Sequence, residues 1–151
     1  MQLPSPILMI CAGNLCRSPF AEAYMRSRLE DAGMEAECFS RGLITMPGRT
    51  VPEIARKMGK EFNVDLTTHI SQPLLGPDID RADIILVMEP SHRQRILSLR
   101  PAHIGKVFLL SQPSHGQPIR DPIGQDEACF RAVYAEIAEH VDAWLQRFGS
   151  Q

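Results

Sequence analysis

Two kinds of apolar pattern alternate along the chain. Short apolar runs, typical of strands buried on both faces, occupy residues 7–10, 83–88 and 106–110, and a short alternating stretch lies at 35–40. Longer segments have apolar residues every three or four positions, and they predict helices over 19–31, 51–62, 76–81, 90–100 and 126–148. Between the last strand and the last helix, residues 111–125 form a long loop rich in Pro, Gly and His.

The order of these segments predicts an α/β fold. Because strands alternate with helices, we expect a doubly wound sheet of about four parallel strands, with right-handed crossovers and helices on both faces. The 151 residues contain no linker and no repeat, so we expect residues 1–151 to form a single domain. Ligands of such sheets bind beyond the carboxyl ends of the strands. The first strand ends at Cys11, which makes this the first place to look for a site.

Composition and charge exclude several classes of function. A formal net charge of −2 gives no reason to expect a nucleic-acid partner, and no apolar run is long enough to predict a membrane partner. Four cysteines are too few for a disulfide scaffold, so the expected compartment is the reducing cytoplasm. No Cys/His spacing fits a zinc site, and we expect neither metal nor cofactor. Apart from His69, the histidines carry no motif and are expected to face solvent.

The segment after the first strand carries the candidate chemistry. Residues 11–19 read CAGNLCRSP. Ser18 is a preferred helix N-cap and Pro19 suits a first helical turn, so a tight loop should lead from the strand into a helix. Backbone N–H groups in such a loop can converge on an anion, and the helix N-terminus adds positive potential. Arg17 offers a planar fork that matches phosphate oxygens, and the potential favours the thiolate of Cys11.

Together with Asp121-Pro122 in the long loop, this motif resembles the signature of the low-molecular-weight protein tyrosine phosphatases. The resemblance covers nearly the whole chain. It implies a phosphatase that needs no metal and hydrolyses phosphotyrosine and small aryl phosphates through a cysteinyl-phosphate intermediate. In that mechanism Cys11 is the nucleophile, Arg17 holds the phosphate and Asp121 is the general acid. The other loop residues implied in phosphate binding are Ala12, Gly13, Asn14, Leu15, Cys16 and Ser18.

Several of these residues have a second interpretation. Ser18 is either the helix cap or, as in the family, a hydrogen-bond donor to the nucleophilic sulfur. Asn14 tolerates a left-handed backbone, and the resemblance implies in addition that Ser40 and His69 hold it in place. Cys16 either fills space in the loop or forms a reversible disulfide with the nucleophile that shields it from over-oxidation.

Asp121 has a structural alternative too, because Asp-Pro is a common turn pair. The chain also departs from the family pattern. Ile123-Gly124 follows the Asp-Pro pair where aromatic residues are frequent, and Arg41 occupies a position that is usually small. We therefore expect an aliphatic substrate cleft, similar to that of bacterial members that act on tyrosine kinases of polysaccharide export.

The expected partner is a phosphotyrosine protein, with a tyrosine kinase among the candidates, and the expected state is a monomer or weak oligomer. Two other functions compete with this one. An arsenate reductase would share the anion loop, but it needs a downstream pair of relay cysteines, and none lies between Cys38 and Cys129. A phosphotyrosine-binding module without catalysis would not need Cys11, Arg17 and Asp121 together.

Overall fold

The computed structural model describes residues 3–149, so both ends of the expected domain lie outside the described residues. In chain order the elements are β1 (Ile7–Cys11), α1 (Arg17–Asp31), β2 (Cys38–Gly42), α2 (Glu53–Glu61), α3 (Gly76–Arg81), β3 (Ile84–Val87), α4 (Pro90–Leu99), the 3-10 helix η1 (Pro101–Lys106), β4 (Val107–Leu109) and α5 (Glu127–Gly149). None of these helices is both long and apolar enough to span a membrane.

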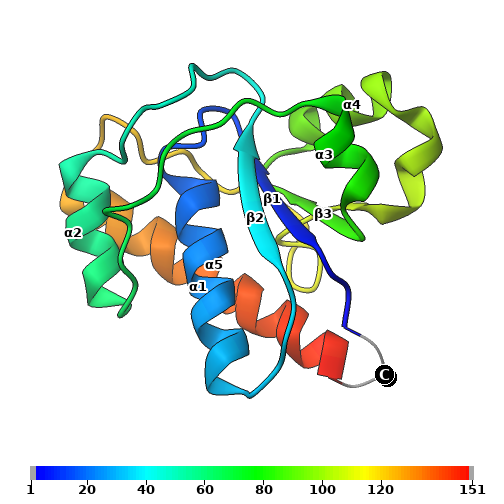
Figure 1. Cartoon of the computed structure of the whole chain (residues 1–151). Helices are drawn as coiled ribbons and strands as arrows, with labels where there is room; N and C mark the ends of the chain where they lie inside the picture. Colours follow the sequence, from blue (N-terminus) through cyan, green and yellow to red (C-terminus); the bar gives the residue numbers. More distant parts are fainter. Residues whose placement is uncertain (1–2, 150–151) are drawn as a thin grey trace.

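The four strands form one sheet in the order β2-β1-β3-β4, and every neighbouring pair is parallel. Helices α1, α2 and α5 cover one face of the sheet, and α3 and α4 cover the other (Figure 1). The predicted doubly wound α/β fold is therefore confirmed. β1 is a central strand, so its carboxyl end opens between β2 and β3.

The continuous apolar run of β1 is explained by two separate cores. Ile7, Met9 and Cys11 pack into the core under α1, α2 and α5. Leu8 and Ile10 point the other way, into the core under α3 and α4. Because successive side chains of a strand alternate between faces, a strand buried on both sides has no polar positions.

Several element boundaries differ by a few residues from the predicted ones, and one element was not predicted. β2 begins at Cys38 rather than at 35, because its pairing with β1 starts at Ile7 and the preceding residues are largely exposed. Residues 101–106 form η1, which the apolar pattern did not show. α1 begins at Arg17, with Cys16 at the N-cap position, so the predicted cap at Ser18 is wrong.

The expectation that the remaining histidines face solvent is wrong for two of them. His92 and His140 are buried. His140 lies on the inward face of α5, between the buried residues Ile137 and Val141 in the helical pattern. A histidine at a core position of an amphipathic helix is buried with its face, whatever its polarity.

Candidate active site

Residues from two distant parts of the chain meet at the carboxyl end of β1. A small pocket is lined by Cys11, Gly13, Leu15, Cys16, Arg17, Asp121 and Ile123. The first five belong to β1, the loop that follows it and the start of α1, and the last two belong to the loop before α5. The three residues predicted to do the chemistry therefore share one pocket, although more than a hundred positions separate two of them.

The sulfur of Cys11 lies inside a hydrogen-bond network, and the residue is only 3% exposed. Its Sγ is 2.9 Å from the hydroxyl of Ser18 and accepts the backbone N–H of Asn14 at 3.3 Å. The Ser18 Oγ already accepts from the Asn14 side chain at 2.9 Å, so its own proton is free to donate to the sulfur. Ser18 makes this contact because it lies inside the first turn of α1 and does not cap the helix. Donors to sulfur stabilise the thiolate.

Arg17 is a buried arginine, only 2% exposed, and its hydrogen bonds hold it in one orientation. Its Nη1 donates to Glu89 Oε2 and to the carbonyl of Ile119, both at 2.8 Å. Its Nη2 lies 3.5 Å from Asp121 Oδ2. A guanidinium fixed on one side by such partners presents its remaining donors to the pocket without losing further side-chain freedom.

Glu89 is a site residue that the sequence analysis missed. It lies two residues after the end of β3 at Val87 and is the N-cap residue of α4, which begins at Pro90. Its position in the sequence could have indicated it, because a carboxylate at the carboxyl end of a buried strand lies at the edge of the sheet where ligands bind. His92 is buried behind it, with Nε2 3.6 Å from Glu89 Oε2, and burial lowers the pKa of this imidazole.

Asp121 closes a turn and also faces the pocket. Its Oδ1 accepts the backbone N–H of Ile123 at 3.1 Å, which closes the turn that Asp-Pro predicts. Its Oδ2 faces Arg17 at the pocket. The side chain is 42% exposed, so a proton can pass between this carboxyl group and a bound molecule or water.

Asn14 connects the loop to three other segments. Its backbone is left-handed, with φ of 55°, and its Nδ2 donates to both Ser18 Oγ and Ser40 Oγ, the latter at 3.0 Å. Its Oδ1 accepts the Gln72 N–H at 3.0 Å, and its carbonyl oxygen lies 3.0 Å from His69 Nε2. Ser40 and His69 thus contact Asn14 directly, which fixes the course of the loop around the sulfur.

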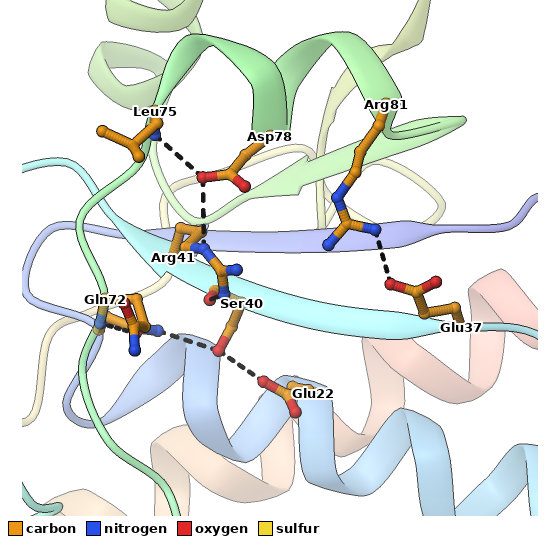
Figure 2. A network of polar contacts seen from close by, with 9 residues as sticks. Glu22, Glu37, Ser40, Arg41, Gln72, Leu75, Asp78 and Arg81 are labelled. Carbon is orange, nitrogen blue, oxygen red and sulfur yellow. Dashed lines mark hydrogen bonds and ion pairs between the residues drawn. The ribbon is translucent and has the colours of Figure 1, made fainter.

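The network continues to Glu22, a second residue that the sequence analysis missed. Ser40 accepts from Asn14 and donates to Glu22 Oε1 at 2.7 Å. Figure 2 shows Ser40 pointing to Glu22 of α1, whereas Arg41 points to Asp78 of α3. Arg41 is 3.3 Å from Asp78 and lies over the Phe39 ring, so the unusual charge after Ser40 is neutralised on the α3 side.

We expect Asn14→Ala to lower both stability and turnover. The change removes the donor to the Ser18 and Ser40 hydroxyls and leaves the Gln72 N–H without its acceptor, at about 1–3 kcal/mol for a group that stays buried and unpaired, and it places alanine in a left-handed backbone. The free energy of unfolding should fall by about 2–4 kcal/mol, and kcat should fall at least about tenfold as the loop loses its geometry. Urea unfolding and steady-state kinetics measure the two effects.

Asn63→Ala is the matched control, because Asn63 has the same left-handed backbone, with φ of 62°, in the turn after α2. It shares the backbone strain but not the network. Equal destabilisation of both variants with unchanged kcat would show that Asn14 is needed only for its left-handed backbone conformation and not for its side-chain hydrogen bonds.

Cys16 is buried and lines the same pocket as Cys11, and all four cysteines are free thiols. Burial, with a contribution from the charge of Asp121, raises the pKa of the Cys16 thiol to about 12. Cys16 is therefore protonated at neutral pH and does not compete as a nucleophile. Its backbone carbonyl accepts from the buried Tyr134 hydroxyl at 2.9 Å, which ties the loop to α5. A reversible disulfide between Cys16 and Cys11 stays a prediction.

The mouth of the pocket is aliphatic. A second hollow beside it shares Gly13 and Leu15 with the pocket and adds Ile44, Thr45, Met46 and Arg49. Ile44 and Met46 are among the most exposed large apolar side chains of the described residues, at 70% and 64%. Among residues 3–149, those that line the two hollows include no aromatic side chain.

Comparisons with known proteins agree with this geometry. A family model described as "Low molecular weight phosphotyrosine protein phosphatase" matches residues 6–151. The probable low molecular weight protein-tyrosine-phosphatase EpsP of Ralstonia nicotianae is 34% identical over 141 residues, which cover 93% of this chain and 94% of that protein. A protein-arginine-phosphatase of Bacillus subtilis is 33% identical over 137 residues, covering 88% and 89%.

The fold comparison leads to the same group. The crystal structure of the Erwinia amylovora tyrosine phosphatase AmsI matches with a TM-score of 0.89 at 31% identity, over 96% of this chain and 93% of that one. The family model spans almost the entire chain, and the loop around Cys11 carries the motif that suggested the resemblance. The chain belongs to the low molecular weight phosphotyrosine protein phosphatase family.

Proposed function

We propose that this protein hydrolyses phosphotyrosine in proteins, and small aryl phosphates, through a phosphate ester of Cys11. The observation that carries the proposal is the shared pocket, in which a hydrogen-bonded thiol, a fixed guanidinium and an accessible carboxyl group converge. A non-catalytic binding module would need the guanidinium alone. The combination of a nucleophile and an acid supports turnover.

The first half of the reaction transfers the phosphoryl group to sulfur. The Cys11 thiolate attacks phosphorus, and the bond from phosphorus to the phenolic oxygen breaks. Asp121 gives its proton to that oxygen, so tyrosine leaves as a neutral phenol. Arg17 and the backbone N–H groups of the loop stabilise the charge on the equatorial oxygens.

The second half of the reaction hydrolyses the phosphoenzyme and regenerates free Cys11. Asp121, now a carboxylate, takes a proton from a water molecule that attacks the phosphorus. The S–P bond breaks, inorganic phosphate leaves, and Ser18 stabilises the returning thiolate by donating to it. Because the cycle requires a reduced sulfur, the proposal also places the enzyme in a reducing compartment such as the cytoplasm.

The aliphatic mouth supports a flat apolar leaving group. Leu15 and Ile123 line the pocket, Ile123 is 49% exposed, and an aromatic ring can pack against such side chains. The substrate would be a tyrosine-phosphorylated protein, with a bacterial tyrosine kinase as the candidate that the family resemblance implies.

A second candidate is phosphoarginine, because one of the relatives is a protein-arginine-phosphatase. A guanidine leaving group carries several N–H donors and needs acceptors at the mouth of the pocket. Asp121 is the one carboxylate among the residues lining this pocket, and it is committed to the proton transfer and to Arg17. Phosphotyrosine therefore fits the site better.

The test compares two peptides that differ only in phosphotyrosine or phosphoarginine, with a chelator present. We expect kcat/KM for phosphotyrosine to be higher by at least about tenfold, the lower limit of what an apolar pocket discriminates. Faster hydrolysis of phosphoarginine would identify the second candidate, and no hydrolysis of either would contradict the proposal. Arsenate reduction assayed with thioredoxin is expected to be absent.

A further inference from the structure

Two histidines and a glutamate converge outside the pocket. His115 belongs to the loop before α5, and Glu136 and His140 lie one turn apart on α5. The Nε2 atoms of His115 and His140 lie 3.2 Å and 2.9 Å from the same oxygen, Glu136 Oε2. The ring centroids are 5.0 Å apart and the ring planes are nearly perpendicular, at 84°.

We propose that these three residues form a binding site for a divalent transition metal, with Zn²⁺ as the best fit. Zn²⁺ takes imidazole nitrogens and carboxylate oxygens at about 2.0–2.2 Å, and three protein ligands leave a fourth position for water. A tetrahedral ion with such bonds separates its ligand atoms by about 3.3 Å. The two distances to Glu136 are close to that value, and all ligand atoms lie within 4.8 Å of one another.

The donor set also selects the kind of metal. Ca²⁺ and Mg²⁺ prefer oxygen ligands, and this site has one carboxylate and two imidazoles. His140 is pre-positioned, because it is 2% exposed and its backbone lies in the middle of a long helix. Its Nδ1 has no hydrogen-bond partner, so hydrogen bonding fixes this ring only through the Nε2 that faces the carboxylate.

Metal binding requires a change of tautomer. In the absence of metal, His115 Nδ1 accepts the Gln117 N–H at 2.8 Å, so the proton of the neutral ring is on Nε2 and points to Glu136. A metal needs the Nε2 lone pair of both rings, so in His115 and in His140 the proton then moves to Nδ1. Gln117 is exposed, so its N–H can bond to water instead.

The proposed ion would connect the loop that lines the pocket, residues 111–125, to helix α5. His115 lies four residues before Ile119, whose carbonyl accepts from Arg17, and six before Asp121. A metal shared by His115 and α5 would therefore hold the loop that carries the proposed general acid against the last helix.

Zn²⁺ titration by calorimetry tests the site. The host is the full chain with Cys11→Ser, because the thiolate is a competing zinc ligand. We expect one equivalent of Zn²⁺ to bind and the midpoint of thermal unfolding to rise, with no response to Mg²⁺. In the same host, His115→Ala and Glu136→Gln should each weaken binding by at least about 100-fold, since even the loss of an outer hydrogen-bond partner of a metal ligand costs 10–100-fold.

His103→Ala is the matched control, because His103 forms a similar exposed pair with Asp80 at 3.1 Å but is not part of the three-residue cluster. It should leave Zn²⁺ affinity unchanged. Co²⁺ bound to the chain should show the visible d–d bands of a tetrahedral ion without the strong near-ultraviolet absorption of a sulfur ligand. Binding that survives both His115→Ala and Glu136→Gln, a sulfur signature, or no binding at equimolar micromolar concentrations would each overturn the proposal.

Discussion

Cys11→Ser is expected to abolish hydrolysis of phosphotyrosine while leaving oxyanion binding intact. The hydroxyl of serine is hardly ionised at neutral pH and replaces the only sulfur that Ser18 and Asn14 contact among the described residues. Arg17 keeps both of its partners, Glu89 and Ile119, so the phosphate oxygens still meet the same donors. Removing the nucleophile should lower kcat by at least about 10⁴-fold, and such losses reach about 10⁶-fold in enzymes with covalent intermediates.

Single-turnover kinetics with a phosphotyrosine peptide measure the loss, and calorimetry with inorganic phosphate measures the retained binding. Cys129→Ser is the matched control, because this thiol is half-buried at the start of α5 and does not line the pocket. It should keep wild-type kcat. Turnover retained by the Cys11 variant would mean that water attacks phosphorus directly, and the phosphoenzyme mechanism would have to be abandoned.

Asp121→Asn should slow substrates with poor leaving groups far more than those with good ones. Phenolate of high pKa needs a proton as the P–O bond breaks, whereas nitrophenolate leaves nearly unaided. General acid assistance is worth about 10²–10⁴-fold, so the loss should approach that range for phosphotyrosine and shrink for nitrophenyl phosphate. Asparagine keeps an Oδ1 that can accept the Ile123 N–H, so the turn survives the substitution.

The measurement is phosphoenzyme formation across a series of aryl phosphates, together with the pH profile. The variant should lose the basic limb of the profile, which reports the loss of the acid's proton. Asp65→Asn is the matched control, since Asp65 closes a similar turn by accepting the Thr67 N–H at 2.9 Å. Equal slowing of all substrates by Asp121→Asn would assign this residue to loop structure alone.

The sequence predicted best those features that depend on neighbouring residues. β1 and the loop after it are set by a local pattern, an apolar run followed by Gly, Asn and Arg, and the structure has them at those positions. The start of β2 was misplaced because pairing with β1, which is a long-range contact, decides where that strand begins. η1 lacks a periodic apolar face, so no pattern could indicate it.

The polar partners of the site were harder to predict than its motif. Glu22 reaches the loop through Ser40, and Glu89 reaches Arg17 across the sheet edge; neither residue belongs to a motif, and the separation from Arg17 to Glu89 is 72 positions. The burial of His92 and His140 likewise depends on which helix faces turn inward. The strand end pointed to Glu89 and the helical spacing pointed to His140, but the partners that these side chains contact follow from the packing of elements.

The central position of β1 also makes the two sides of the pocket differ in how often they open locally. β1 pairs with β2 and β3, and its side chains enter both cores, so its amide hydrogens should exchange with solvent only when the whole chain unfolds. Residues 111–125 lie outside the strands and helices, and many of them are exposed, so their amides exchange through local openings. Cys11 is thus attached to the part of the chain that opens most rarely, and Asp121, the proposed proton donor, to a part that opens locally. Entry of substrate and departure of phosphate can therefore depend on local opening of the loop that carries Asp121.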